Sequence, residues 1–236
     1  MTISQQLASQ NIRTANTKGD LAAIEMQIPK RYRSKTLYNL TNMDLIISNT
    51  RISLQRGVSM FITGGTGSGK THLAVGLMLE YFADHLDDYE YALTIHPSTM
   101  LPWPDGRPEF YLTDKPRPIF IAAMDLYQSV KRSYQDPAAK TETAIADRLT
   151  NTPLLCLDDL GAERLSEFGR ALMGYALDRR YRDNMQTIVT SNLSMADIAN
   201  KIDDRIASRL CEMASVVDLG NHDHRIKPTL FPENEA

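Results

Sequence analysis

At residues 64–71 the chain reads Gly64-Gly65-Thr66-Gly67-Ser68-Gly69-Lys70-Thr71. This run fits the pattern G-x-x-x-x-G-K-[ST], which cradles phosphate groups. Its glycines let backbone N–H groups turn inward and approach a phosphate without an intervening Cβ. Lys70 supplies a positive charge to the β- and γ-phosphates, and the Thr71 hydroxyl is suited to ligate Mg²⁺. The stretch therefore predicts a nucleotide-binding loop.

The residues on either side of the loop support this interpretation. Residues 59–63 form a short apolar run typical of a buried strand, and residues 71–82 have the pattern of a helix. Strand, glycine-rich loop and helix is the arrangement that the motif requires, with the positive end of the helix dipole at the phosphates. We count His72, the next residue along the helix, with the nucleotide-binding residues. A glycine-rich surface turn is the alternative, and a chance match arises in on the order of one in a hundred chains of this length.

Composition indicates a soluble globular protein. The 236 residues fit one domain with a full core, and the apolar and charged contents, 42% and 23%, are ordinary. No apolar run is long enough to span a bilayer, and the N-terminus lacks the pattern of a secretory signal. Cys156 lies in an apolar run and Cys211 in a polar one, so we expect no disulfide framework and a cytoplasmic location.

The net charge of −3 excludes a polycation, but the charge is uneven. The segment from residue 30 to 56 is basic, and the segment from residue 84 to 114 is acidic. The basic segment either binds nucleic acid or forms an ordinary solvated surface, and charge alone favours the second interpretation.

The pattern divides the chain into three parts. We expect an N-terminal extension at residues 1–57, a candidate partner-binding segment, then a core at 58–220 and a tail at 221–236. Residues 85–118 contain six prolines and form an inserted block, in which residues 89–95 and 109–112 are candidates for a hairpin. The remaining core alternates apolar strands with helices, the strands falling at 119–122, 154–157, 187–190 and 216–218 and the helices at 125–134, at 140–149 and after a Ser166 cap. This alternation predicts the α/β fold of P-loop NTPases, a parallel sheet covered by helices on both faces.

Two acidic residues, Asp158 and Asp159, follow the apolar run at 154–157. In an open α/β sheet the carboxyl ends of the strands form the edge at which ligands bind. Asp158 is suited to hold the Mg²⁺ shell, and Asp159 is placed to orient the attacking water. The structural alternative is a strand that leaves the core through an acidic turn, completed by Gly161.

Asn192 ends the next strand, so its amide emerges at the same edge and is placed to sense the γ-phosphate or to hold the water against Asp159. The alternative role is helix capping, because Ser194 begins a variant of the capping box. Further along, Arg205 and Arg209 lie four residues apart on one helical face. Nearby acidic residues are able to neutralise them, or Arg209 projects into a neighbouring subunit as an arginine finger.

Together these residues resemble the AAA+ ATPases, and within them the bacterial helicase loaders of DnaC and DnaI type and the IstB-type transposition helpers. The resemblance covers about residues 28–220 apart from the inserted block. It implies that Lys70 and Thr71 form Walker A and that Asp158 and Asp159 form Walker B. Asn192 corresponds to sensor 1, and Arg209 to the arginine finger with Arg205 in support. The family assembles into rings or spirals on DNA, so the resemblance implies ATP with Mg²⁺ and a self-assembled active form.

Loaders of this group often hold single-stranded DNA with the helices between the second and third core strands. The corresponding region here carries candidate DNA contacts at Lys131, Arg132, Tyr134 and Lys140, a mixture of cations for phosphates and an aromatic ring for base stacking. The same residues also suit an ordinary helix surface.

Two departures from the family matter. The second Walker B acid is Asp159, where many members have glutamate, so we expect slow, assembly-dependent hydrolysis. The stretch after residue 218 leaves no room for a C-terminal helical lid, and Arg225 is the candidate for a sensor 2 residue.

The sequence thus predicts an ATPase that loads or remodels a replicative helicase on single-stranded DNA. A transposition helper that assembles on duplex DNA and recruits a transposase is the alternative. A P-loop small-molecule kinase is a distant third, because such a kinase needs a mobile lid that carries arginines, and the proline-rich inserted block is acidic instead.

Overall fold

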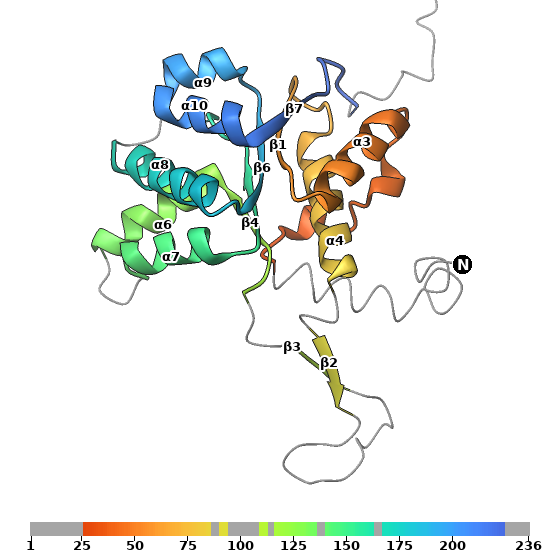
Figure 1. Cartoon of the computed structure of the whole chain (residues 1–236), viewed down its shortest axis with the longest axis horizontal. Coiled ribbons are helices and arrows are strands. Elements are labelled where there is room, and N and C mark those ends of the chain that lie inside the picture. Colours follow the sequence, from red (N-terminus) through yellow and green to blue (C-terminus); the bar gives the residue numbers. More distant parts are fainter. Residues whose placement is uncertain are drawn as a thin grey trace, which may run out of the picture.

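The computed structural model describes residues 26–85, 90–93, 109–112, 116–135, 140–162 and 167–224. Within these residues a central parallel sheet lies between two layers of helices, as Figure 1 shows. The strand order is β4-β5-β6-β1-β7. The strands are β1 (Ser59–Thr63), β4 (Ile119–Ala122), β5 (Leu154–Asp158), β6 (Gln186–Ser191) and β7 (Ala214–Asp218), and every neighbouring pair is parallel.

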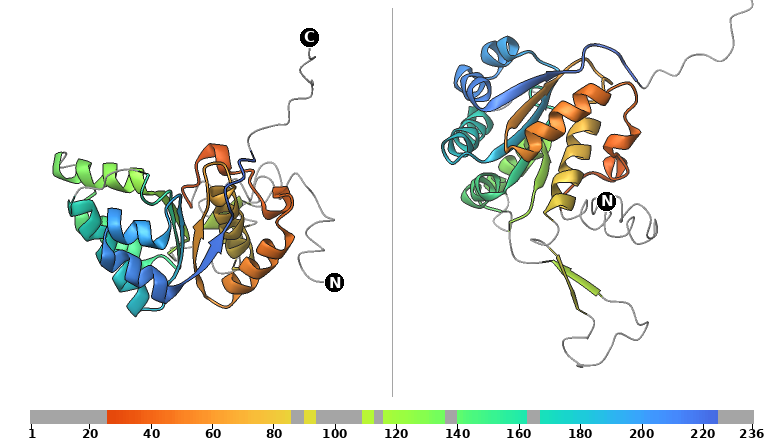
Figure 2. Two further views of the ribbon diagram at one scale, coloured as in Figure 1. Left: turned by 90° about the horizontal axis from the view of Figure 1, so that it is seen from above. Right: turned by 45° about the vertical axis from the view of Figure 1, so that its right-hand side comes forward.

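The two helical layers differ in size. One face of the sheet carries α3 (Asp44–Gln55) and α4 (Lys70–Asp84), together with the short 3₁₀ turns η1 (Lys30–Tyr32) and η2 (Leu37–Asn39). The other face carries α6 (Ala123–Gln135), α7 (Glu142–Asn151), α8 (Glu167–Arg182), α9 (Met195–Lys201) and α10 (Asp204–Met213), as Figure 2 shows from two further sides.

The strands alternate between two hydrophobic cores because successive side chains of a strand point to opposite faces. Met60 and Ile62 of β1 pack with α3 and α4, whereas Phe61 between them packs with the larger layer. Cys156 joins the smaller core as a fully buried residue, and burial raises the pKa of its thiol. Strands buried on both sides explain why their sequences are continuously apolar.

The predicted elements are confirmed wherever they fall in the described residues. The five strands and the helices lie within a few residues of the expected bounds. β2 (Glu90–Leu93) and β3 (Glu109–Leu112) pair antiparallel as the expected hairpin, in a second sheet of their own. Ser166 lies outside the described residues. After β7 the structure describes Leu219 to His224, a segment without regular secondary structure.

The strand order places the carboxyl ends of β1, β5 and β6 side by side, with β7 on the far side of β1. The chain leaves β1 for the far edge of the sheet, returns through β4, β5 and β6, and then crosses β1 to form β7. Such a switch in strand order opens a crevice at the carboxyl edge of the sheet. The glycine-rich loop, Asp158 and Asn192 therefore meet at one edge.

The segment before β1 packs directly against α4. Leu37 occupies the space beside Gly76, where an added Cβ would lie 2.5 Å from Leu37 Cδ2. Met26 is fully buried, and its carbonyl accepts a hydrogen bond from Phe120 N on the edge strand β4 at 2.8 Å. The segment from Met26 to the start of β1 is thus part of the folded body. None of the helices among the described residues has the length and apolar character needed to cross a membrane.

Candidate active site

The glycine-rich loop runs from the end of β1 to the start of α4 with a backbone that glycine alone adopts freely. Gly67 and Gly69 have φ of 81° and 97°, in the left-handed region. Lys70 turns back over the loop, and its Nζ donates hydrogen bonds to Gly64 O at 2.9 Å and Gly65 O at 2.7 Å. Buried Ser68 Oγ has no hydrogen-bond partner within the described residues. A compact glycine backbone, an ammonium group and a buried hydroxyl fit a polyphosphate at a helix N-terminus.

Asp158 lies at the end of β5 and is joined to two hydroxyls from neighbouring elements. Thr71 Oγ1 donates to Asp158 Oδ1 at 2.9 Å, and Thr190 Oγ1 donates to the same oxygen at 2.6 Å. Burial raises the pKa of the Asp158 carboxyl, and the hydrogen bonds from Thr190 and Thr71 and the charge of Lys70 act in the opposite direction. The contact between Thr71 and Asp158 brings together the two groups that the sequence assigned to Mg²⁺. A hydroxyl and a carboxylate are the oxygen donors that Mg²⁺ prefers.

Asp159 follows with φ of 58°, an uncommon backbone conformation for a residue with a side chain. Its backbone N–H donates to Thr190 Oγ1 at 2.9 Å. Asn192 Nδ2 donates to Asp159 Oδ1 at 3.1 Å. The structure thus brings Asp159 and Asn192 together, with Asn192 exposed and Asp159 half-buried.

The carboxyl ends of β5 and β6 are joined by further hydrogen bonds. Leu160 N donates to Thr190 O at 2.8 Å, and Ser191 Oγ donates to Leu160 O. Sequence reasoning placed polar groups at this edge but did not assign Thr190 as the link between Asp158 and Asp159. The sequence does contain a signal for this role, because Thr190 carries a hydroxyl two positions before Asn192, on the strand that neighbours β5.

His72 faces the N-terminal segment. His72 Nε2 and Thr36 O are 2.9 Å apart, and burial lowers the pKa of the imidazole. Its side chain therefore anchors the segment around η2 to α4, which is a structural role beside the nucleotide loop.

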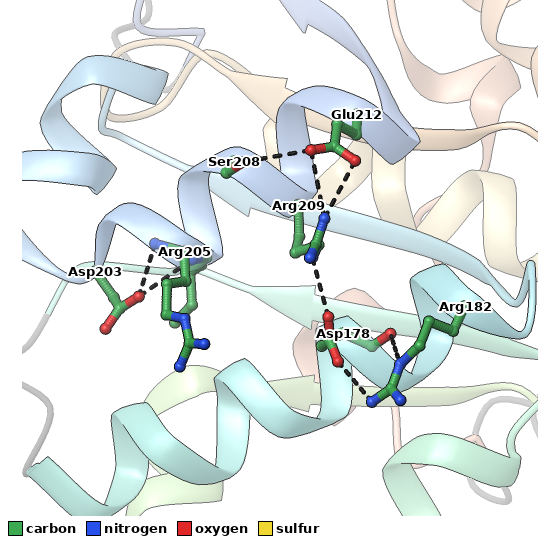
Figure 3. A network of polar contacts seen from close by, with 8 residues as sticks. Asp178, Arg182, Asp203, Arg205, Ser208, Arg209 and Glu212 are labelled. Atoms are coloured by element: carbon green, nitrogen blue, oxygen red, sulfur yellow. Dashed lines mark hydrogen bonds and ion pairs between the residues drawn. The ribbon is translucent and has the colours of Figure 1, made fainter.

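Arg209 is held within its own chain by a network that Figure 3 shows. Its Nε donates to Asp178 Oδ1 on α8 at 3.0 Å, and its Nη1 lies 3.2 Å from Glu212 Oε2. The guanidinium also covers the ring of Tyr181, with 4.8 Å from Cζ to the ring centroid. Glu212 is one of the nearby acidic residues that the sequence offered for neutralising the arginines, whereas Asp178 is a partner that the sequence did not reveal.

Arg205 has a different environment although it lies on the same helix. Asp203 caps the helix by accepting hydrogen bonds from the backbone N–H groups of Arg205 and Ile206. The Arg205 side chain is exposed, points away from Arg209 and its partners in Figure 3, and makes no polar contact with the described residues. Both arginines line a hollow of about 490 Å³ between α8 and α10.

The candidate DNA contacts separate into two groups. Arg132 and Lys140 line a groove of about 350 Å³ between α6, α7 and β4, and Arg148 of α7 joins them there. Lys131 is exposed outside this lining, and Tyr134 donates its hydroxyl to Glu142 Oε2 at 3.1 Å. Burial lowers the pKa of Arg148, which sequence reasoning had passed over. Arg225 lies outside the described residues.

Comparisons with known proteins give similar sequences and similar folds. Residues 117–230 match the family of IstB-like ATP binding proteins. The replicative helicase loader DnaC of Buchnera aphidicola subsp. Schizaphis graminum is 22% identical over 152 residues, which are 64% of this chain and 50% of that protein. The chain spans about half the length of the curated relatives it matches.

Two solved structures share the fold. A crystal structure of the DnaC helicase loader has a TM-score of 0.59 and 24% identity, covering 80% of this chain and 99% of the other. A crystal structure of DnaI has a TM-score of 0.58 and 20% identity, covering 82% and 95%. Residues 117–230 are therefore similar to IstB-like ATP binding proteins, and the described residues share the fold of the DnaC and DnaI structures.

Proposed function

We propose that this protein is an ATP-driven switch that loads or remodels a replicative helicase on single-stranded DNA. The contact between Asp159 and Asn192, beside the Thr71–Asp158 pair and the phosphate loop, is the observation that carries the ATPase part. An ATPase needs a carboxylate and an amide that orient water next to the phosphate-binding loop, and these residues meet that need. Similarity to proteins named as helicase loaders supports the choice of partner.

The proposed division of labour follows from the positions of the groups. Lys70 and the loop amides bind the phosphates, while Asp159 and Asn192 orient the water. Thr71 and Asp158 would hold Mg²⁺, which when bound neutralises charge on the phosphates. Asp159 has a shorter side chain than glutamate, so we propose that hydrolysis is slow and sets the lifetime of an assembled state.

We propose that Arg209 completes the site of a neighbouring subunit. In the single chain Arg209 is engaged by Asp178 and Glu212, but both ion pairs are partly exposed, with about a third or more of each side chain open to solvent. Such pairs contribute about 0–1 kcal/mol. A phosphate in a neighbouring site therefore competes readily for the guanidinium when subunits assemble.

The groove between α6 and α7 is the proposed contact with DNA. Arg132, Lys140 and Arg148 supply positive charge, and none of the described residues that line the groove is acidic. Ser129 and isoleucine and leucine side chains form the rest of its wall, so the groove offers charge for phosphates and apolar surface for bases. Arg132→Glu and Lys140→Glu should each weaken binding of a single-stranded oligonucleotide and reduce its salt dependence. Lys131→Glu is the matched control, because Lys131 lies on the same helix but outside the groove.

The alternative is a transposition helper that assembles on duplex DNA and recruits a transposase. The IstB-like match of residues 117–230 favours it, since it covers the larger helical layer and the candidate DNA groove. The same ATP site serves both functions, so the partner and the form of DNA distinguish them.

Purified components test the proposal. The host replicative helicase, a single-stranded circle and a duplex of equal length are mixed with the wild-type chain, Asp159→Asn or Lys70→Ala. We expect Asp159→Asn with ATP to form a lasting complex with the helicase on the single strand, the wild type to release it, and Lys70→Ala to form none. Assembly of Asp159→Asn on the duplex alone, without helicase binding, would contradict the loader proposal and favour the transposition helper.

A further inference from the structure

The segment from Leu219 to His224, which we call the strap, runs along the phosphate loop. β7 pairs with β1 up to the partners Thr63 and Asp218. Beyond that point Leu219 N donates to Thr63 O at 2.9 Å, and Gly65 N donates to Gly220 O at 2.7 Å. The pairing of β7 with β1 thus continues into the loop itself.

A third hydrogen bond reaches the middle of the loop, where His224 N donates to Gly67 O at 3.1 Å. Gly67 has φ of 81°, so the strap binds the loop at one of the positions whose backbone is least favourable for ordinary residues. Hydrogen bonds from outside the loop restrict it to one conformation among those that a glycine-rich chain can adopt.

The strap also explains two of the loop glycines. A Cβ on Gly64 would lie 2.8 Å from Gly220 O and 3.3 Å from Leu219 Cβ. A Cβ on Gly65 would lie 3.0 Å from both Cα and Oδ1 of Asn221. Side chains at positions 64 and 65 would therefore collide with the strap, which explains why both residues are glycine.

We propose that the strap positions the phosphate loop, so that affinity for ATP depends on Leu219–His224 although these residues lie outside the nucleotide motif. This inference rests on the proposed ATP-dependent function. A loop held in its binding conformation before the ligand arrives loses less entropy on binding, and its affinity is correspondingly higher. The strap residues are positioning residues, and their effect falls on nucleotide affinity more than on the turnover of bound ATP.

Gly220 offers a test that leaves the site residues unchanged. Its φ is +66°, but a Cβ at this position meets nothing within 4 Å. Gly220→Val strains the strap backbone without a steric clash, whereas Gly220→Asn adopts the left-handed conformation at little cost. Gly57 is the matched control, because its φ is +73° and it also has open space, but it lies in the turn between α3 and β1.

We expect Gly220→Val to raise the Kd and KM for ATP by about tenfold while kcat at saturation changes little. Gly220→Asn and Gly57→Val should bind ATP as the wild type does. His224→Pro, which removes the N–H bonded to Gly67, should resemble Gly220→Val, and His224→Ala should be neutral because it keeps the N–H. Equal ATP affinity in Gly220→Val and Gly57→Val would overturn the inference.

Hydrogen exchange gives a readout that needs neither nucleotide nor helicase. The Gly65 N–H should exchange slowly in the wild type and in Gly57→Val, and fast in Gly220→Val. A Gly65 N–H that exchanges rapidly in the wild type would refute the strap even if ATP binds. Failure of the wild-type chain to load a helicase, with slow Gly65 exchange and the tenfold affinity effect intact, would refute only the proposed function.

Discussion

The hydroxyl of Thr190 donates a hydrogen bond to Asp158 Oδ1 at 2.6 Å. The same hydroxyl accepts the backbone N–H of Asp159 at 2.9 Å, so one side chain of β6 fixes both acidic residues at the end of β5. Asn192 stands two residues further along the chain and contacts Asp159. A movement of the end of β6 would therefore displace both Asp158, the proposed Mg²⁺ ligand, and Asp159, the proposed water-orienting carboxylate.

Replacing Thr190 by valine keeps the shape of the side chain and removes this link. A hydrogen bond to a charged group contributes about 1.5–3 kcal/mol, so we expect Mg²⁺-dependent ATP affinity or turnover to fall about tenfold or more. Thr150→Val is the control for loss of a buried threonine hydroxyl, since Thr150 bonds only within α7 in the described contacts. Equal ATP kinetics in the two variants would exclude a role for Thr190 in the site.

Asp158→Asn should change how stability depends on pH. Burial raises the folded-state pKa of Asp158, so its ionisation opposes folding once the pH rises through that pKa. Without nucleotide and Mg²⁺ we expect the variant to gain thermal stability over the wild type as the pH rises from the ordinary aspartate pKa, about 4, through the raised pKa of the folded carboxyl. Mg²⁺ with ATP should stabilise the wild type and not the variant. A difference in Tm that is constant with pH would show that Asp158 ionises normally in the folded chain.

Arg209→Ala should leave the monomer almost as stable as the wild type, because its ion pairs are partly exposed. ATP affinity should persist, and hydrolysis that depends on assembly should fall by about a hundredfold or more, as for loss of an arginine finger. Arg205→Ala measures the contribution of the exposed neighbour on the same helix. Retention of assembly-dependent turnover in Arg209→Ala, with loss in Arg205→Ala, would transfer the role to Arg205.

Arg180 stabilises the amino ends of β5 and β6, at the end of the sheet opposite the glycine-rich loop. It is fully buried, and its guanidinium donates to the backbone carbonyls of Leu149, Thr152 and Gln186 and to Thr187 Oγ1. Burial lowers the pKa of Arg180 to about 10. We expect Arg180→Leu to destabilise the chain by about 3–5 kcal/mol, because buried carbonyls lose their donors. Arg179→Leu, at an exposed neighbouring position, should cost less than about 1 kcal/mol in the same urea titration.

Much of the fold was predictable because its signals are local. The apolar run at 59–63, the glycine-rich loop and the following helical pattern come one after another in the sequence, and this order predicts a strand, a phosphate-binding turn and a helix. The structure confirms the strand β1 and the helix α4 on either side of the loop. Parallel strands bring their carboxyl ends to one edge, so the meeting of Thr71 with Asp158 and of Asp159 with Asn192 followed from the order of the motifs.

The remaining features depend on contacts between distant segments. Asp178 and Arg209 lie 31 residues apart and meet only because α8 and α10 pack together. Arg180 has the sequence pattern of a solvent-exposed helix residue, and only the packing of α8 on the sheet buries it. The strap bonds through backbone groups, which leave no sequence signal beyond glycines at 64, 65 and 220.

ATP turnover per subunit, measured against subunit concentration with and without single-stranded oligonucleotide, tests the central claim most directly. We expect the rate per subunit to rise with concentration, to rise further with the single strand, and to vanish in Asp159→Asn, which keeps the backbone conformation at that position because asparagine tolerates it. A rate per subunit that is constant at every concentration, or equal in the wild type and Asp159→Asn, would contradict an assembly-dependent ATPase built on this site.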